Sequence, residues 1–291
     1  MSGTLFFAFV NKTILVPTDF SENAHIALNY AIGMAKEYQY DIHLIHAFQA
    51  LTSKFGDETF NKEITDHAET QALQQLELLR TEKQAAHPEV NFSKDCLEGN
   101  NLSEVLTSIS GKSNYLLIVM GTKGSTGMRD RLLGSNTFNT ILKSPIPVLA
   151  IPEEFDRFTM SRAGLLTNFK KTDIPLLKSF SEIFGQKIQI TLLHVLEKNR
   201  TEEESQLLSW KEHLEDKTGW RDLRWKISSV SPRLDVDESL PDCIHDMAEE
   251  DQLEVLLVHY NSKGFFKRIF SKSLVKSFAH HIHRPVFFYR D

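Results

Sequence analysis

The sequence predicts an α/β fold made of two tandem domains, each with five parallel strands and helices on both faces of its sheet. Short aliphatic runs alternate with stretches of helical periodicity along the chain, and this alternation is typical of parallel sheets with crossover helices. The order of the runs also repeats after about 140 residues, which indicates a duplicated domain rather than a solenoid.

In the first half, apolar runs predict strands at residues 13–17, 42–47, 90–97, 116–120 and 148–151. Apolar residues at helical spacing predict helices at 23–37, 60–83, 102–110 and 135–142. On the 60–83 helix they form one face, made of Ile64, Ala68, Ala72, Leu76 and Leu79. Asn100 or Asn101 precedes the 102–110 helix and is expected to cap it.

The second half repeats this order. We expect its strands near 163–167, 187–196, 223–230, 253–258 and 285–289, and its helices near 172–184, 201–218, 237–250 and 271–280. The string Leu15-Val-Pro-Thr-Asp-Phe resembles Gly164-Leu-Leu-Thr-Asn-Phe in both order and spacing. We place the boundary in the charged stretch 152–158, which gives domains 1–152 and 153–291. Since no long flexible linker separates the halves, they are expected to pack against each other.

Composition narrows the class of protein. The chain has 291 residues, of which 41% are hydrophobic and 25% charged, and a net charge of −6. This is ordinary for a globular protein, and the acidic balance argues against a nucleic-acid partner. No apolar run approaches the ~20 residues that span a bilayer, so no membrane partner is expected. The short run 5–10 lacks the flanks of a signal peptide and is expected to be disordered or to extend a strand.

The two cysteines, Cys96 and Cys243, lie in different halves and have no motif around them. Reduced thiols of this kind are the default in cytosolic proteins. The sequence therefore predicts a cytoplasmic location and no disulfide.

A glycine-punctuated segment, Gly121 to Asn136, follows the fourth predicted strand of the first half. Glycines let backbone amides approach an anion closely. Ser135 and Asn136 stand at a helix start, where negative charge is favoured, so the segment is predicted to bind phosphate. It has neither the Walker spacing nor the Rossmann spacing. In the structural alternative, the glycines only make a tight turn and Ser135 only caps the helix.

These residues resemble the ATP-binding branch of the universal stress protein family, whose motif is Gly-x2-Gly-x9-Gly-Ser/Thr-Asn. The opening segment 14–22 and the closing segment 145–149 of the first half also match that family. The resemblance covers the whole chain as a tandem pair, and it is stronger over 12–152 than over 161–291. It implies a Rossmann-like fold of the adenine nucleotide alpha hydrolase type.

The resemblance also implies a site at the carboxyl ends of the strands, where the strand order reverses. Asp19 would lie near the base and ribose, and its carboxylate could accept from sugar hydroxyls or help hold a metal. The expected ligand is ATP, with ADP or AMP as alternatives, and Mg²⁺ with the phosphates is left open. The residues assigned to the site are Pro17, Thr18, Asp19, Ala47, Met120, Gly121, Gly124, Gly134, Ser135 and Asn136.

The second half keeps the loop but not its glycines. Aligned without gaps, Val258, Asn261 and Ser271 fall on the three motif glycines, and Asn168 falls on Asp19. The second domain is therefore expected to be degenerate and not to bind ATP. Because the fold tolerates this loss, the glycines of the first half are expected to be kept for a ligand.

The histidines suggest little chemistry. His280, His281 and His283 cluster in sequence, but neighbours on a helix cannot share a face, and the sequence leaves any metal site unknown. His43 and His46 fall on opposite faces of one strand. His46 and His194 occupy matching strand positions and are expected to be structural.

No catalytic set is present: there is no Gly-x-Ser-x-Gly elbow and no evident general base. We therefore expect a stress-response protein whose first domain binds ATP and regulates conformation or partner contact, with hydrolysis slow at most. The second domain would replace the other subunit of the family's homodimer, although two whole chains could still pair. The alternatives are an interaction module that binds no nucleotide and a slow ATPase.

Overall fold

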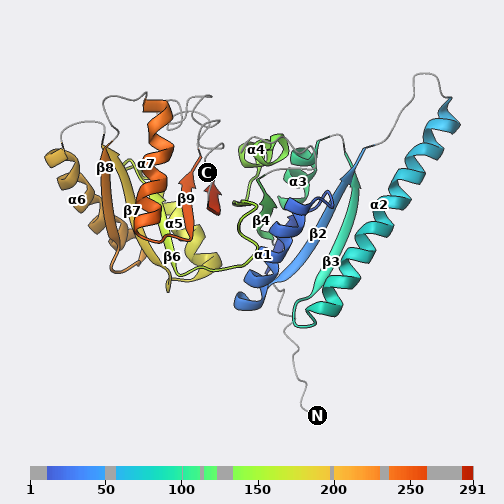
Figure 1. The fold of residues 1–291 in the computed structure, drawn as a ribbon, viewed down its shortest axis with the longest axis horizontal. Helices are drawn as coiled ribbons and strands as arrows, with labels where there is room; N and C mark the ends of the chain where they lie inside the picture. Colours follow the sequence, from blue (N-terminus) through green and yellow to red (C-terminus); the bar gives the residue numbers. More distant parts are fainter. Residues whose placement is uncertain are drawn as a thin grey trace, which may run out of the picture.

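A computed structural model describes residues 12–49, 57–99, 101–111, 115–122, 134–196, 200–229, 236–260 and 284–290. Their strands form one ten-stranded sheet (Figure 1). The strands are β1 (Thr13–Pro17), β2 (Asp41–Phe48), β3 (Phe92–Glu98), β4 (Tyr115–Gly121), β5 (Val148–Ile151), β6 (Arg162–Leu166), β7 (Gln189–Leu196), β8 (Arg224–Ser229), β9 (Val255–His259) and β10 (Val286–Tyr289). The helices are α1 (Glu22–Tyr38), α2 (Glu58–Ala86), α3 (Leu102–Ser110), α4 (Ser135–Lys143), α5 (Asp173–Phe184), α6 (Arg200–Thr218) and α7 (Val236–Glu250).

The sheet order is β3-β2-β1-β4-β5-β10-β9-β6-β7-β8. Read inward from its two outer edges, the sheet has the same strand order twice: β3-β2-β1-β4-β5 and β8-β7-β6-β9-β10. Every pairing within a half is parallel. The halves meet where β5 and β10 pair antiparallel, with Val148 opposite Phe288 and Ala150 opposite Val286. The predicted α/β fold is confirmed, and the two expected five-stranded sheets are joined into one mixed sheet.

Most predicted elements are present within a few residues of their expected bounds. Asn101 caps α3, since its side chain accepts from the Ser103 N–H. Helix α2 begins earlier than its apolar pattern suggested because Asp57 caps it, accepting from the Phe60 N–H at 2.8 Å. The predicted helix 271–280 and the apolar run 5–10 lie outside the described residues.

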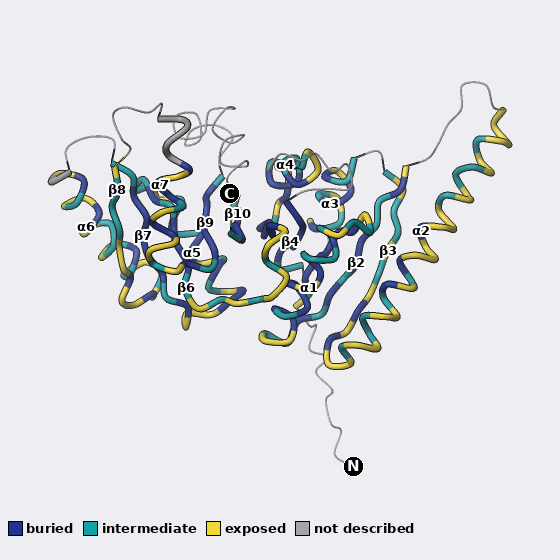
Figure 2. Tube along the Cα trace, viewed as in Figure 1, coloured by how far each residue is buried: buried dark blue, intermediate teal, exposed yellow. Residues whose placement is uncertain are grey.

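Two apolar cores cover the two faces of the sheet, and both continue across the β5–β10 junction. Helices α1, α2, α5 and α6 contribute to one core, and α3, α4 and α7 to the other. Figure 2 shows the buried residues concentrated along the strands between these layers. None of the described helices combines the length and the apolar content needed to cross a membrane.

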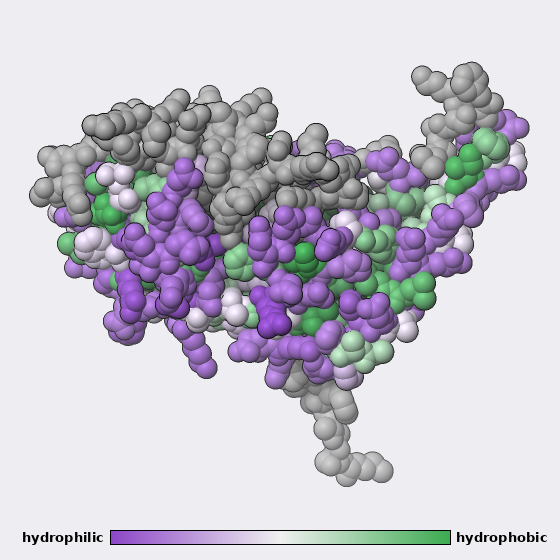
Figure 3. Space-filling model, viewed as in Figure 1, coloured by the Kyte–Doolittle hydropathy of each residue, from purple (hydrophilic) through white to green (hydrophobic). Residues whose placement is uncertain are grey.

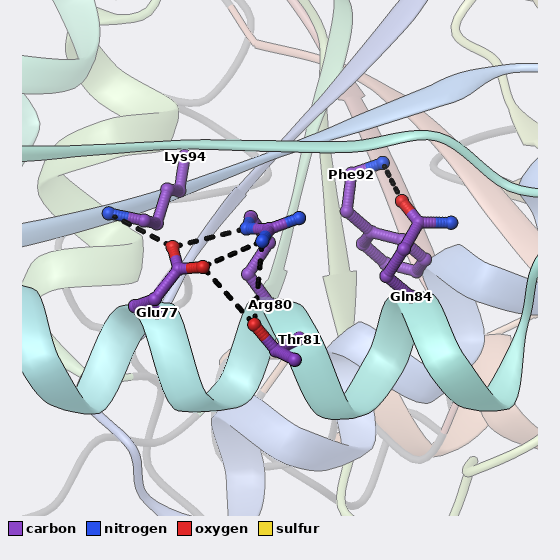
Figure 4. Close-up of polar contacts among 6 residues, drawn as sticks. All are labelled: Glu77, Arg80, Thr81, Gln84, Phe92 and Lys94. Atoms are coloured by element: carbon purple, nitrogen blue, oxygen red, sulfur yellow. Dashed lines mark hydrogen bonds and ion pairs between the residues drawn. The ribbon is translucent and has the colours of Figure 1, made fainter.

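Besides the buried Leu76 and Leu79, polar contacts join helix α2 to the edge strand β3 (Figure 4). Glu77 accepts from Arg80 at 2.6 Å and pairs with Lys94 at 3.4 Å, and the hydrogen bond from Arg80 lowers the pKa of Glu77 to about 2. Gln84 accepts from the Phe92 N–H at 3.2 Å. Ile64 and Ala68 of the predicted face are only half-buried, because the N-terminal half of α2 runs past the sheet. Among the described residues seen in Figure 3, most of the surface is hydrophilic, with smaller hydrophobic areas between.

The two halves are sealed on one face by aromatic side chains. Phe158, in the connection between β5 and β6, packs edge-on against Tyr30 and Tyr38 of α1. It sits so close to the helix that a Cβ on Gly33 would lie 2.6 Å from the Phe158 Cβ. Tyr38 also packs edge-on against Phe184 of α5, with ring centroids 5.6 Å apart. The expected packing between the halves is thus present.

Replacing Phe158 by alanine is expected to lower the free energy of unfolding by about 2–3 kcal/mol, because it leaves a cavity at the junction. The matched control is Phe60→Ala on α2, whose ring is 49% exposed and whose loss is expected to cost about 0.5 kcal/mol or less. Urea denaturation followed by circular dichroism measures both. Equal losses for the two variants would show that Phe158 does not stabilise the junction.

Candidate functional site

The turn after β1 is built on the neighbouring strand β2. The Thr18 N–H donates to the Ile45 carbonyl at 2.8 Å, and the Thr18 carbonyl accepts from His46 Nδ1 at 2.8 Å. The Thr18 hydroxyl accepts from the Phe20 N–H at 3.0 Å. Phe20 adopts a left-handed backbone, with φ at 61°, and its ring lies against that of His46. Three of these contacts fix the end of β1 relative to β2, and the Phe20–Thr18 bond holds the turn itself.

The second domain repeats this turn closely. The Thr167 carbonyl accepts from His194 Nδ1 at 3.0 Å, and its hydroxyl accepts from the Phe169 N–H at 3.0 Å. Phe169 is also left-handed and lies against His194. The two histidines are structural, as expected, and the turn belongs to the fold rather than to any one ligand.

His43 lies on the other face of β2, as expected from its spacing. Tyr115 lies 3.0 Å from its Nδ1, and the Asp95 carboxylate lies 3.3 Å from its Nε2. Burial lowers the pKa of His43, and Asp95 opposes that shift. His43 and His46 therefore cannot form a joint site.

Strand β1 lies between β2 and β4, so the strand order reverses there. Pro17, at the end of β1, is buried opposite Ile45 of β2. Asp19 follows this strand end and is exposed. Its Oδ1 accepts from the N–H of Ser21 at 3.1 Å and from its hydroxyl at 2.5 Å. Ser21, not Asp19, caps α1, which leaves the remaining Asp19 surface at the rim where parallel-sheet ligands bind.

Ala47 is half-buried near the end of β2, and Met120 is buried near the end of β4. Gly121 ends β4 against the first turn of α1: a Cβ at this position would lie 2.9 Å from the Asn23 carbonyl oxygen. The expectation that Gly121 is kept for a ligand was therefore incomplete. Close packing of strand against helix requires glycine there whether or not a ligand is present.

Helix α4 begins at the same edge of the sheet. Gly134 is its N-cap residue, and no side chain caps the helix. Ser135 and Asn136 lie in the first turn and are exposed. The alternative in which Ser135 caps the helix is therefore wrong. An uncapped helix N-terminus has amides that suit a phosphate. Gly124, the remaining motif glycine, lies outside the described residues.

The residues present thus fit an adenine nucleotide, since an exposed carboxylate and an uncapped helix start lie at one switch point. The sheet places Asp19, Ala47, Gly121 and the start of α4 along this one edge. No general base other than Asp19 is among the residues assigned to the site.

Strand pairing corrects the alignment of the second half. Ile118 of β4 pairs with Val148, and Leu256 of β9 pairs with Val286; each of these partners follows a proline. Counted from this register, Gly121 corresponds to His259 and not to Val258. The gapless comparison was one residue out because it was anchored on the loop rather than on the strands. His259 is 3% exposed, so an imidazole stands where the first domain has a glycine.

The second domain also holds a buried polar cluster that the sequence did not reveal. Asp173, at the start of α5, accepts from the Thr167 hydroxyl at 2.5 Å and from Trp210 Nε1 of α6 at 3.1 Å. Glu203 of α6 pairs with His194 Nε2 at 3.0 Å. These contacts tie α6 to the turn after β6 and to the end of β7. Their residues are far apart in sequence and follow no motif.

The described residues contain no group of three or more His, Cys, Asp or Glu side chains arranged for a metal ion. His280, His281 and His283 lie outside those residues. Cys96 and Cys243 are both free thiols, as the sequence predicted.

Comparison with known proteins gives consistent matches. The model of the universal stress protein family matches residues 11–152. Universal stress protein MJ0577 of Methanocaldococcus jannaschii is 30% identical over 156 residues, covering 48% of this chain and 94% of that protein. A universal stress protein structure from Archaeoglobus fulgidus covers 96% of both chains with a TM-score of 0.64 and 20% identity. A universal stress protein solved in complex with cAMP covers 48% of this chain and 97% of its own, at 20% identity and a TM-score of 0.36.

The buried cluster predicts an unusual pH dependence for the second domain. Burial raises the pKa of Asp173 from 3.8 to about 6. A raised folded-state pKa contributes stability below the unfolded value, and this stability is lost as pH rises through the folded value. Asp173→Asn removes this titration. As pH rises from 4 to 7, the free energy of unfolding of the variant should therefore increase by about 2 kcal/mol relative to that of wild type.

The measurement is urea denaturation at several pH values, followed by tryptophan fluorescence. All three tryptophans, Trp210, Trp220 and Trp225, report on the second domain. Asp216→Asn is the control of opposite sign, because Lys217 lowers the pKa of that exposed carboxyl. A constant difference between wild type and Asp173→Asn across this range would rule out the buried carboxyl as its source.

Proposed function

The chain belongs to the universal stress protein family, and we propose that its first domain binds one adenine nucleotide, ATP in the first place. The observation that carries the proposal is the uncapped start of α4 beside the exposed Asp19, at the point where the strand order reverses. Helix amides favour phosphate and a carboxylate accepts from ribose hydroxyls. The motif from Gly121 to Asn136 joins the end of β4 to this helix start.

Each assigned residue has a role in this proposal. The backbone amides of Gly124, Gly134, Ser135 and Asn136, with the Ser135 hydroxyl, bind the phosphates. Gly121 lets the ribose approach the end of β4. Ala47 and Met120 offer backbone groups to the adenine edge, and Pro17 and Thr18 hold the turn that presents Asp19. Mg²⁺ would be held mainly by the phosphates, with Asp19 as the carboxylate within the assigned set. ADP and AMP share the adenosine end and compete for the same contacts.

The second domain is proposed to bind no nucleotide. His259 occupies the position of Gly121 and is buried, so the second domain lacks the first glycine of the motif. At the ends of β6 and β7, two side chains of α6 form hydrogen bonds within the protein. Glu203 bonds to His194, and Trp210 donates to Asp173. Among the described residues, these four side chains are therefore bonded within the protein rather than open to a ligand.

The proposed role is regulatory: nucleotide occupancy of the first domain changes conformation or partner contact in a cytoplasmic stress response. The cytoplasmic location rests on the unpaired cysteines. A homodimer of whole chains is compatible with this role. Because β10 already pairs with β5, a second chain would have to pair through another surface. A nucleotide-independent interaction module is the main alternative.

Isothermal titration of the full chain with ATP is expected to give one site per chain. Gly134→Val should weaken binding by about tenfold or more, because a branched side chain blocks close approach to the helix start. Gly111→Val is the matched control, since Gly111 ends α3 and a Cβ there meets only the Thr107 carbonyl at 3.7 Å. Absence of ATP binding by wild type would favour the nucleotide-independent alternative. Two ATP sites per chain would refute the proposal that the second domain binds no nucleotide.

Phosphate release separates binding from turnover. Wild-type protein with Mg-ATP is expected to release phosphate slowly, since the assigned residues provide no activating base besides Asp19. Any true turnover should fall in Gly134→Val in step with ATP affinity. Turnover that survives the substitution would come from a contaminant or another site, and rapid turnover lost with Gly134→Val would establish an ATPase instead.

A further inference from the structure

We propose that Thr137 is a positioning residue for the nucleotide site, and that it clamps the strand end to the helix start on either side of the phosphate-binding segment. This inference rests on the proposed ATP binding by the first domain. Thr137 lies in the first turn of α4, one residue beyond the motif. It is 2% exposed, whereas Ser135 and Asn136 beside it are exposed.

The Thr137 hydroxyl does not bond to its own helix. It donates to the carbonyl of Gly121, the last residue of β4, at 2.7 Å. The next carbonyl, that of Thr122, accepts from the Gly134 N–H at 2.6 Å. Two consecutive carbonyls at the strand end are therefore held by two groups at the helix start. The two ends of residues 123–133 are fixed side by side by these bonds.

The strand end is also held from its other sides. The Thr122 N–H donates to the Ile151 carbonyl of β5 at 3.0 Å. The Asn23 backbone of α1 leaves no room for a side chain at Gly121. The clamp therefore pulls α4 onto a strand end that cannot shift. Because these bonds already hold the strand end and the helix start together, less ordering of these two elements remains to be done on binding.

The second domain has no counterpart of this hydroxyl. The gapless alignment places Leu274 opposite Thr137, and the alignment set by the strands places Val275 there. Neither side chain donates a hydrogen bond. In sequence, this position thus carries a hydroxyl in the domain that keeps the motif and an aliphatic side chain in the domain that has lost it, although Leu274 and Val275 lie outside the described residues.

Thr140 provides a matched control on the same helix. It is 0% exposed, and its hydroxyl donates to the carbonyl of Asn136 within α4 at 2.8 Å. Thr137→Val and Thr140→Val each remove one buried hydroxyl at nearly constant volume. Only the first removes a bond between the strand end and the helix; the bond from the Gly134 N–H to the Thr122 carbonyl remains in both variants. A purely structural role would make the two variants behave alike.

The test is the ratio of ATP affinity to adenosine affinity, measured by titration of the full chain. Thr137→Val is expected to lower ATP affinity by about tenfold and adenosine affinity by less than about twofold, since the clamp orients the phosphate end. Thr140→Val should leave the ratio unchanged, and Thr137→Ser should restore it. If Thr137→Val folds poorly, the same affinity ratio can be measured with Thr137→Ala. This variant also lacks the hydroxyl and places no additional methyl group against the Gly121 carbonyl.

Failure of the inference and failure of the proposed function give different results. Wild-type protein that binds no ATP overturns both. Wild-type binding with an unchanged ratio in Thr137→Val, or with an equal fall in Thr140→Val, overturns the clamp alone. The clamp is also overturned if the ratio of ATP affinity to adenosine affinity falls in Thr137→Val and Thr137→Ser does not restore it. The hydroxyl would then not be the cause of the fall.

Discussion

The antiparallel pairing of β5 with β10 is the constraint on which the rest of the molecule depends. Each half ends in a short, wholly apolar strand, and such a strand exposed at a sheet edge would invite pairing with other chains. Pairing the two edges satisfies both sets of backbone groups and extends both cores across the junction. Phe158 and Tyr38 then seal one face. The domains are therefore two copies of one topology but a single folded sheet.

The duplication allows structural and ligand-directed features to be separated within one chain. The threonine, left-handed phenylalanine and histidine of the first turn occur in both domains with nearly the same distances. They stabilise the strand ends wherever this topology is used, so they carry little information about a ligand. The exposed Asp19 has no such copy, because Asn168 stands in its place. The glycine at 121 also has no copy, since His259 replaces it, but packing against Asn23 already accounts for that glycine.

The sequence predicted the elements well because periodicity and caps are local signals. It failed where the answer depended on packing between distant segments. The need for glycine at 121 comes from the carbonyl of Asn23, nearly a hundred residues earlier in the chain. The one-residue error at Val258 arose because strand register, not loop similarity, fixes the alignment. The contact between Asp173 and Trp210 joins two helices with no shared motif, so no spacing could have indicated it.

The same argument explains why the two domains differ at their strand ends. A polar group at such an end must bond to the protein, to water or to a ligand. In the second domain, Glu203 and Trp210 of α6 bond to His194 and Asp173. Helix α6 thereby covers the strand ends, and the burial of Asp173 raises the pKa of its carboxyl. In the first domain, Ala24 takes the place of Asp173 and α2 begins further along the chain. With no such side-chain network in its described part, that edge keeps its carboxylate and its helix start exposed, and this is the difference on which the proposed nucleotide site rests.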